Sequence, residues 1–323
     1  MHSASRVFIA GHRGLVGSAI CRRLTAAGYD HLLLRTSGEL DLTHRTAVWE
    51  FFQSERPEYV VLAAAKVGGI HANNTYPVDF IRDNLLIQSN VIDACYEFGV
   101  TRLLFLGSSC IYPKLCPQPI REEYLLTGPL EPTNRPYAVA KIAGIEQCWA
   151  YNRQYGTKFV AAMPTNLYGP EDNFDLASSH VLPALLRKVA TAKETGSNQV
   201  EVWGTGTPRR EFLYSDDLAE ACIFLLQLPA EKLETLLRQD VPPLINIGVG
   251  EDISIRDLAE LICRILEYKG SLRFNTSQPD GTPRKLLDVS RMQALGWTAR
   301  TRLEEGIRRT YAAMKDRLGS GTV

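Results

Sequence analysis

The sequence predicts an α/β protein built on a doubly wound parallel sheet, with a smaller carboxy-terminal lobe. Short apolar runs alternate along the chain with longer segments of helical period, as strands alternate with covering helices in such a sheet. Glycines with the spacing G-x-x-G-x-x-G follow the first apolar run and open the first helical segment, at residues 11–17. Dinucleotide-binding folds of the Rossmann type place a glycine-rich turn at this point.

Length and composition indicate a two-lobed globular protein. The chain has 323 residues, more than one core usually supports, and 45% are hydrophobic against 22% charged. These proportions exclude disordered, collagenous and coiled-coil classes. Because 36 basic and 36 acidic side chains cancel, charge gives no reason to expect nucleic acid or a membrane surface as a partner. We therefore expect a small-molecule partner.

Cysteine usage and hydropathy point to a reduced, cytoplasmic protein. The longest apolar run, Val60 to Ala65, is far shorter than the roughly 18 residues that span a bilayer. Residues 1–6 lack the apolar region of a signal peptide. The 7 cysteines are scattered and never spaced C-x-x-C, so we expect neither a disulfide framework nor a metal site.

The first lobe is expected at residues 1–170. Its strands are expected at 6–10, 31–35, 59–64, 102–106 and 158–163. Its helices are expected at 15–27, 77–98 and 137–155, with one more over Val48, Phe51 and Phe52 that Thr43 could cap. The proline-rich segment 113–136 is too long for a simple connection and is a candidate functional loop.

After Pro170 the loops lengthen, and residues 171–323 are expected to form mainly the second lobe. Helices are predicted at 180–195 and 216–228, and after the capping residues Ser254 and Thr301. The strand-like runs at 212–214 and 244–247 are expected to return to the first sheet.

The glycine turn is the candidate site for a dinucleotide pyrophosphate, since backbone N–H groups and a helix N-terminus meet there. Its residues are Gly11, His12, Arg13, Gly14, Leu15, Val16 and Gly17. A plain tight turn is the alternative. At the end of the second strand stands Arg35, where an acidic residue would favour NAD and a cation favours the 2′-phosphate of NADP. We therefore predict NADP(H), although Arg35 could be a solvated strand end.

Ser108, Tyr137 and Lys141 form a candidate catalytic set. Ser108 follows the fourth strand, and Tyr137 and Lys141 are four residues apart on one face of a predicted helix. The charge of Lys141 is expected to lower the pKa of the Tyr137 phenol and make it a general acid near neutral pH. Taken alone, Y-x-x-x-K is as compatible with an ordinary surface helix.

With these motifs the sequence resembles the extended short-chain dehydrogenase/reductases of the NAD-dependent epimerase/dehydratase family, and among them the GDP-L-fucose synthases. The resemblance runs from Val7 to about Trp297 and is carried by residues 8–14, 63–70, 106–114, 163–170 and 279–288. The glycine turn is shared widely. Ser-Ser-Cys-Ile-Tyr-Pro-Lys at 108–114 and the run at 279–288 are narrower signatures.

This resemblance implies that Ser108, Tyr137 and Lys141 are the reductase triad and that Cys110 and His180 carry out an epimerisation. We expect Cys110 as the base and His180 as the acid, because their ordinary pKa values bracket neutrality. Three alternatives stay open. Cys110 could be a small buried apolar residue, His180 could merely cap its helix, and Cys116 is a rival thiol in the same loop.

The resemblance also implies further binding residues. Those for the cofactor, besides the glycine turn and Arg35, are Leu106, Gly107, Ser108, Ser109, Lys141, Pro164, Thr165, Asn166, Leu167 and His180. Those for the nucleotide of the substrate are Lys188, Trp203, Arg210 and Asp280. Lys188 stands where relatives commonly have Arg, which weakens bidentate phosphate binding. Ser37 stands where some have another Arg, which softens the preference for NADP.

The implied reaction converts GDP-4-keto-6-deoxy-D-mannose to GDP-L-fucose by 3,5-epimerisation and NADPH-dependent reduction at C4. One ketone at C4 makes the hydrogens on both C3 and C5 acidic, so donors at its oxygen serve every step. The resemblance implies a homodimer formed through the helices at 77–98 and 137–155. The alternatives are a 4-epimerase or 4,6-dehydratase of the same superfamily, and a non-catalytic NADP-binding regulator.

Overall fold

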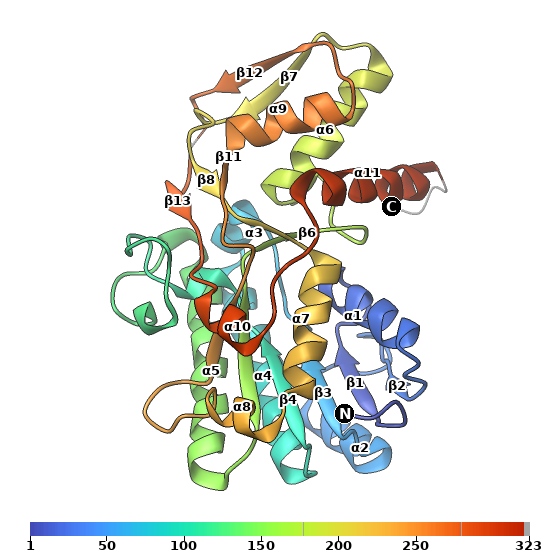
Figure 1. The fold of residues 1–323 in the computed structure, drawn as a ribbon, viewed down its shortest axis with the longest axis vertical. Coiled ribbons are helices and arrows are strands. Elements are labelled where there is room, and N and C mark those ends of the chain that lie inside the picture. The colour runs from blue at the N-terminus through green and yellow to red at the C-terminus, as the bar shows by residue number, and fades with distance from the viewer. Residues whose placement is uncertain (177, 279, 320–323) are drawn as a thin grey trace.

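Six parallel strands form the central sheet of the computed structural model, which describes residues 1–176, 178–278 and 280–319 (Figure 1). Their order is β10-β5-β4-β3-β1-β2, and each neighbouring pair is parallel. The strands are β1 (Val7–Ala10), β2 (Leu32–Leu33), β3 (Tyr59–Leu62), β4 (Arg102–Leu106), β5 (Phe159–Pro164) and β10 (Leu244–Ile247). Chain order reverses beside β1, so β1 and β3 end at the switch point where such sheets bind ligands.

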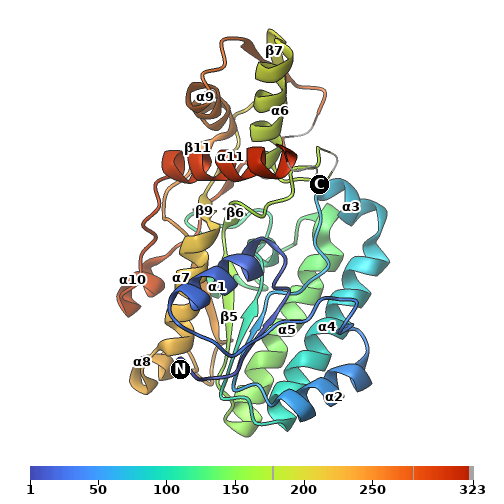
Figure 2. The ribbon, with the colours of Figure 1, turned by 90° about the vertical axis from the view of Figure 1, so that its right-hand side faces the viewer.

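Helices cover both faces of this sheet (Figure 2). One face carries α2 (Arg45–Glu55), α4 (Pro77–Glu97) and α5 (Arg135–Tyr155), and the other carries α1 (Leu15–Ala26) and α7 (Ser215–Gln227). Each layer has its own core. Phe52, Ile92 and Ile145 pack on the first face, and Ile20 and Leu225 pack on the second. The predicted doubly wound α/β class is confirmed.

The second lobe lies at the top of Figure 1. It contains α6 (Val181–Thr195), α9 (Ile255–Ile265), α11 (Leu303–Gly319) and the parallel pair β7 (Gln199–Trp203) and β12 (Ser271–Asn275). Leu186, Leu258 and Ile307 lie in its separate apolar core. A small sheet of β8 (Arg209–Arg210), β11 (Ile253–Ser254) and β13 (Arg284–Lys285) lies between this lobe and the first.

The two strand-like runs expected to return to the first sheet lie in different sheets. Residues 244–247 do form β10, beside β5. The expectation for 212–214 is wrong, because β9 (Phe212–Tyr214) pairs with β6 (Asn166–Tyr168) in a separate two-stranded sheet. Since β9 follows β8 after a single residue, it is held above the carboxyl ends of the central strands and cannot reach the edge that β10 occupies. After β13 the chain also returns through α10 (Ser290–Leu295), which packs on the first lobe.

Of the predicted helix caps, only the one at Ser254 is correct. Its hydroxyl accepts the Asp257 N–H at 3.0 Å and begins α9. Thr301 caps no helix, because its N–H and hydroxyl both donate to the Asp217 carboxylate, and α11 begins at Leu303. Thr43 likewise donates to Asp41 instead of capping α2, which begins at Arg45. The short helices α3 (Ile70–Thr75) and α8 (Ala230–Glu234) were not predicted.

The proline-rich loop is ordered around Asn246 of β10. The buried side chain of Asn246 accepts the Tyr112 hydroxyl at 2.6 Å and donates to the Ile120 carbonyl at 2.9 Å. Its N–H donates to the Glu122 carboxylate at 2.9 Å. Three one-turn 3-10 helices, η1 (Ser109–Ile111), η2 (Glu122–Tyr124) and η3 (Pro132–Asn134), shape the segment. The loop is therefore attached to the edge of the central sheet.

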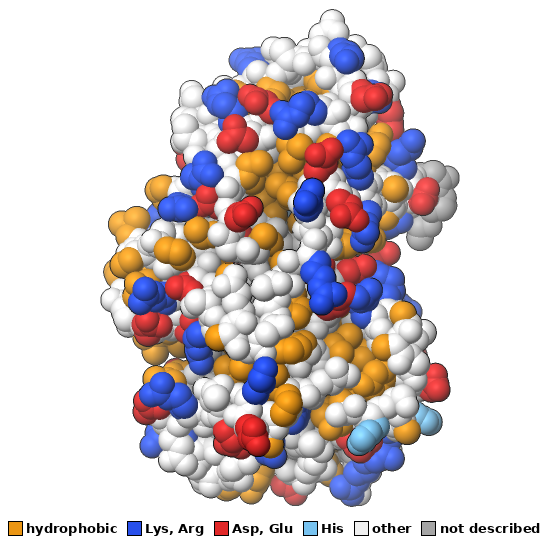
Figure 3. All heavy atoms as spheres, viewed as in Figure 1, with side chains coloured by type: hydrophobic (Ala, Val, Ile, Leu, Met, Phe, Trp, Pro, Cys, Tyr) orange, Lys and Arg blue, Asp and Glu red, His pale blue; other side chains and the backbone are white. Residues whose placement is uncertain are grey.

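Basic and acidic side chains are interspersed over the face shown in Figure 3, in keeping with the zero net charge. Within the part of the chain that the structure describes, none of the helices has both the length and the apolar character needed to cross a membrane.

Glu211 joins the two lobes, and we expect its loss to destabilise the fold strongly. The side chain is fully buried, and its carboxylate accepts N–H groups of Val249 at 2.6 Å, Gly250 at 2.7 Å and Leu287 at 3.0 Å. Glu211→Ala leaves these donors buried without a partner, at about 1 kcal/mol or more each. Urea unfolding should show a loss of about 3 kcal/mol, whereas exposed Glu231→Ala should unfold as the parent does. Equal midpoints for both variants would contradict this role.

Candidate active site

Ser108 and Cys110 lie together at the carboxyl end of β4. Gly107 precedes them, and a Cβ there would meet the end of the Met163 side chain of β5, so a larger residue would require Met163 to move. Ser108 precedes η1, which holds Cys110 in a buried position, 7% exposed. The Ser108 hydroxyl lies close enough to the Cys110 thiol to oppose the rise in its pKa that burial causes. A hydroxyl and a thiol are thus adjacent at the end of a central strand.

Tyr137 and Lys141 reach the same place from α5. Gly144 lets this helix approach closely, since a Cβ there would lie 2.5 Å from the Phe105 ring. The buried Lys141 ammonium donates to the Leu106 carbonyl at 2.8 Å and lies 5.8 Å from the centre of the Tyr137 ring. The structure therefore brings Ser108, Cys110, Tyr137 and Lys141 together.

The expected effect of Lys141 on Tyr137 is not found. Burial raises the pKa of the Tyr137 phenol well above its ordinary value, and the nearby Cys110 adds to this rise. Burial lowers the pKa of Lys141 to about 8. The Lys141 ammonium donates to the Leu106 carbonyl instead of the phenol. Burial therefore keeps the phenol protonated. A protonated phenol is the form that a general acid requires.

His180 stands at the N-terminus of α6, with part of its side chain exposed. Its side chain makes no capping hydrogen bond to that helix, so the alternative role as a helix cap is not observed. Surrounding protein lowers the pKa of the imidazole, and the positive charge of Lys285 lowers it further. His180 and Cys110 therefore both lie within the electrostatic reach of Lys285.

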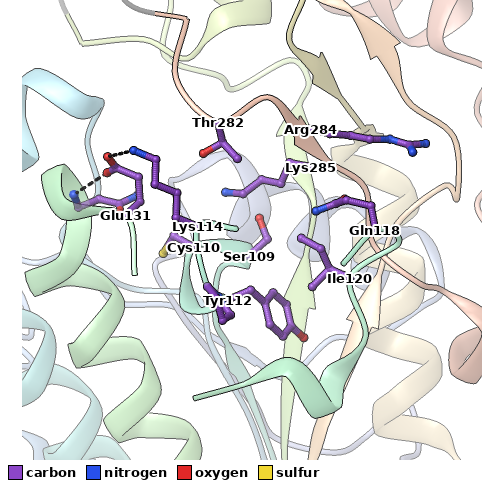
Figure 4. Close-up of a pocket in the computed structure, with 12 residues that line it drawn as sticks. Ser109, Cys110, Tyr112, Lys114, Gln118, Ile120, Glu131, Thr282, Arg284 and Lys285 are labelled. Atoms are coloured by element: carbon purple, nitrogen blue, oxygen red, sulfur yellow. Dashed lines mark hydrogen bonds and ion pairs between the residues drawn. The ribbon is translucent and has the colours of Figure 1, made fainter. Parts of the chain in front are cut away.

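A pocket of about 370 Å³, measured with its open mouth, lies beside Cys110 (Figure 4). The proline-rich loop and β13 form its walls. Ser109, Cys110, Lys114, Glu131 and Lys285 are among its lining residues. Lys285 was not predicted as a site residue. It lies in the run at 279–288 that carries the narrower resemblance, which was the only signal for it; Pro279 itself is outside the described residues.

The glycine turn fits a dinucleotide. Gly11 has φ 86°, and a Cβ on Gly17 would collide with the Gly11 carbonyl, so both positions require glycine. Gly14 begins α1 with no side-chain cap, and no acidic residue lies in the first helical turn. Uncapped N–H groups at a helix N-terminus favour a phosphate. His12 Nδ1 is buried there without a hydrogen-bond partner, a second polar atom suited to a ligand.

Residues 164–167 lie at the carboxyl end of β5, from its last residue into β6. Thr165 and Asn166 are fixed there by side-chain hydrogen bonds to the Glu211 carbonyl, at 3.3 and 2.8 Å. The Thr165 N–H also donates to the Ile247 carbonyl at 3.0 Å. This segment of the predicted cofactor set is therefore positioned by the same residue that joins the lobes.

The strand predicted to end at Arg35 is shorter than expected, because β2 ends at Leu33 and Arg35 lies two residues beyond it. Arg35 is also paired within the protein. Its guanidinium binds the Glu55 carboxylate at 2.5 Å and lies 5.4 Å from the centre of the Phe51 ring. The sequence did not indicate Glu55, which is 20 residues away on α2. A guanidinium has five N–H donors, so the pairing leaves donors for a second anion. Arg13, in the glycine turn, is exposed.

The four predicted nucleotide-binding residues lie on the second lobe and the small sheet. Lys188 of α6 lies 5.3 Å from the centre of the Trp203 ring, and Trp203 is 58% exposed. Arg210 pairs across strands with Lys285. The Asp280 carboxylate accepts the N–H and the hydroxyl of Thr205, at 2.7 and 2.9 Å, and its role towards the nucleotide stays a prediction.

Comparison with known proteins identifies the family. A family model described as "NAD dependent epimerase/dehydratase family" matches residues 7–248. The chain belongs to this family. GDP-L-fucose synthase 1 of Arabidopsis thaliana is 56% identical over 308 residues, 95% of this chain and 92% of that protein. GDP-L-fucose synthase of Escherichia coli (strain K12) is also 56% identical, over 96% of both chains.

Among solved structures of this family, GDP-mannoheptose C4 reductase from Campylobacter jejuni with NADP bound resembles the chain with a TM-score of 0.90. The two are 40% identical, and the similarity covers 98% of this chain and 99% of that one. These findings confirm the resemblance read from the sequence motifs.

Proposed function

We propose that the chain converts GDP-4-keto-6-deoxy-D-mannose to GDP-L-fucose, by 3,5-epimerisation and then NADPH-dependent reduction of the C4 ketone. The observation that carries the proposal is the thiol of Cys110 beside the Ser108 hydroxyl, in one site with Tyr137 and Lys141. A 4-epimerase or a dehydratase has no need of a thiol base at this place. Relatives 56% identical over nearly the whole chain are GDP-L-fucose synthases.

Ser108 and Tyr137 supply the hydrogen bonds to the ketone oxygen. In the epimerisation these donors stabilise the enolates formed at C3 and C5, and in the reduction Tyr137 donates its proton to the alkoxide at C4. The raised pKa of Tyr137 keeps that proton in place until the alkoxide forms. NADPH, when bound on the glycine turn, supplies the hydride for C4. Lys141 holds the β4 end through the Leu106 carbonyl.

Cys110 and His180 divide the proton transfers at C3 and C5. Inversion needs removal of a proton from one face and delivery to the other, and the two residues come from different elements, η1 and the N-terminus of α6. Cys110 is the base and His180 the acid. The lowered pKa of His180 makes its imidazolium a stronger acid towards the enolate, and it also reduces the fraction of imidazole that carries the proton near neutral pH.

For the nucleotide of the substrate, Trp203 offers a stacking face and Lys188 and Arg210 offer positive charge for the diphosphate. Lys188 is already held beside Trp203 by its hydrogen bond to the Glu201 carbonyl at 3.1 Å. The Asp280 carboxylate fixes Thr205 in the loop that follows Trp203, and it keeps lone pairs that can accept a hydrogen bond from the nucleotide.

One incubation tests this function. The protein is mixed with GDP-4-keto-6-deoxy-D-mannose and NADPH in deuterated water, and the product sugar and its labelled carbons are identified. We expect GDP-L-fucose labelled at C3 and C5. Reduction without label would indicate a C4 reductase alone, and turnover without added NADPH would indicate a 4-epimerase.

The cofactor preference should depend on Arg35. Arg35→Ser removes a cation from the end of β2, and the loss of a charged hydrogen bond to the 2′-phosphate should raise the KM for NADPH about tenfold. The KM for NADH should stay unchanged. Arg45→Ser is the matched control, because Arg45 on α2 also pairs with a carboxylate, that of Asp93. Equal changes with both cofactors in Arg35→Ser would refute the assignment of the 2′-phosphate to Arg35.

We propose that two copies associate through α4 and α5. Exposed apolar side chains gather on these helices, with Val78 65% and Val139 39% exposed beside an apolar groove. Val139→Glu places a charge in that groove and should convert the dimer to a monomer in sedimentation experiments. Leu115→Glu, at an 83% exposed position of the proline-rich loop, should leave the dimer intact. A Val139→Glu variant that sediments as the parent does would exclude this interface.

We also propose a cytoplasmic location. All seven cysteines are free thiols in the structure, which suits a reducing compartment.

A further inference from the structure

Lys285 lies in the pocket beside Cys110, and the proposed reaction has not yet used it. Both residues line the pocket, and the Lys285 side chain extends from β13 over Ser109 and Cys110 (Figure 4). Its ammonium and the thiol lie close enough for each to favour the charged form of the other. Burial lowers the pKa of Lys285, and the nearby Cys110 opposes this fall. In its protonated form Lys285 is a cation facing the proposed base.

The backbone holds Lys285 in this position. Its carbonyl accepts the Glu211 N–H at 3.3 Å, and two residues later the Leu287 N–H donates to the Glu211 carboxylate at 3.0 Å. Across the small sheet it pairs with Arg210 of β8. Since Glu211 is fully buried, the strand that carries Lys285 is fixed to the first lobe, where Cys110 lies.

Several charged or titratable groups surround Cys110 and Lys285. Facing Cys110 are Lys285, the Ser108 hydroxyl, and Lys141 and Tyr137 of α5. Lys285 faces, besides Cys110, Arg210 of β8 and two residues of the proline-rich loop, Glu131 and Cys116.

Burial raises the pKa of the Cys110 thiol, and the charge of Lys285 is the strongest of the influences that oppose this rise. Without Lys285 the buried thiol would keep its proton to higher pH.

We propose that Lys285 is a positioning residue for Cys110, whose ammonium stabilises the thiolate that removes the protons at C3 and C5. The thiolate takes the proton and becomes a thiol, the substrate keeps the electron pair as an enolate, and Lys285 stays protonated throughout. The same cation favours proton release from His180. The role in epimerisation rests on the proposed function, whereas the link between the ammonium and the thiol does not.

The link is tested on the protein without substrate. Alkylation of Cys110 by iodoacetamide is followed from pH 6 to 10 by peptide mass spectrometry. In Lys285→Met the midpoint of the pH profile should rise by about one unit, so that alkylation near pH 7.5 slows about tenfold. Lys285→Arg keeps the charge and should keep the midpoint. Lys114→Met, from the other lysine of the same pocket, is the matched control and should not shift it.

Two further measurements keep the outcomes distinct. The rate at Cys263, on α9 of the second lobe, should not change in any variant and reports general effects on the fold. If thermal unfolding shows that Lys285→Met is unfolded, Lys285→Gln replaces it, with the same upward shift expected. A midpoint in the Met or Gln variant equal to that of the parent would overturn the proposal. A shifted midpoint in the Lys285 variants, together with no labelled product when the parent protein is given the sugar, would instead overturn the proposed function alone.

Discussion

Tyr137→Phe is expected to slow the reduction at C4 by a factor of about 10² to 10⁴, the usual contribution of a positioned general acid. The hydroxyl of Tyr137 is the only part removed, since phenylalanine keeps the ring that packs edge-on against Phe80 at 6.3 Å. Thermal unfolding and NADPH binding should therefore match those of the parent. Single-turnover measurement of NADPH oxidation with the keto sugar gives the rate.

The control for this variant is Tyr268→Phe. Tyr268 also donates its hydroxyl to a carbonyl, that of Ser197 at 2.8 Å, but it lies on the second lobe. The Tyr268→Phe variant should reduce the sugar at the rate of the parent. A Tyr137→Phe variant within about tenfold of the parent would show that another group supplies the proton, because removal of a true acid costs more.

Cys110→Ser should suppress deuterium incorporation at C3 and C5 by about 100-fold or more, since the serine hydroxyl is far too weak an acid to form the base at neutral pH. The ketone remains a hydride acceptor, so the variant should still oxidise NADPH slowly and form a reduced sugar that has not been epimerised. Nuclear magnetic resonance of the product in deuterated water measures both effects.

Cys116→Ser is the matched control, because Cys116 is a partly buried thiol of the same loop and also senses the charge of Lys285. It should exchange C3 and C5 as the parent does. Normal exchange in Cys110→Ser, or lost exchange in Cys116→Ser, would falsify the assignment of the base.

Much of the central sheet could be predicted because its signals are local. The run at 102–106 is a strand at the expected residues, and the long helix predicted from Pro77 ends at Glu97, next to the expected Phe98. The glycine turn needed only its spacing and its place between a strand and a helix, since backbone geometry there depends on residues next to one another. Ser108, Tyr137 and Lys141 follow from motifs of the same kind, whereas Cys110 was implied only by the resemblance to a known family.

Features that depend on partners far along the chain could not be predicted. Thr301 has the spacing of a cap, yet Asp217 of α7 takes its donors. The run at 212–214 has the composition of a strand, but its position just after β8 directs it to β6. The pKa of Tyr137 was predicted to fall, but it rises, because burial of the phenol, which no spacing reveals, dominates and the nearby Cys110 adds to the rise.

By itself the sequence determined the fold class and the nucleotide turn and indicated Ser108, Tyr137 and Lys141 as site residues, because each depends on neighbours within one or two turns of chain. Only the tertiary structure decided which charges face them. Lys285 meets Cys110, Glu55 pairs with Arg35, and Glu211 fastens three segments together. Charge and burial act through space, between residues that can be far apart in the chain. Lys285 and Cys110, for example, are 175 positions apart, so no local sequence pattern indicates that they meet.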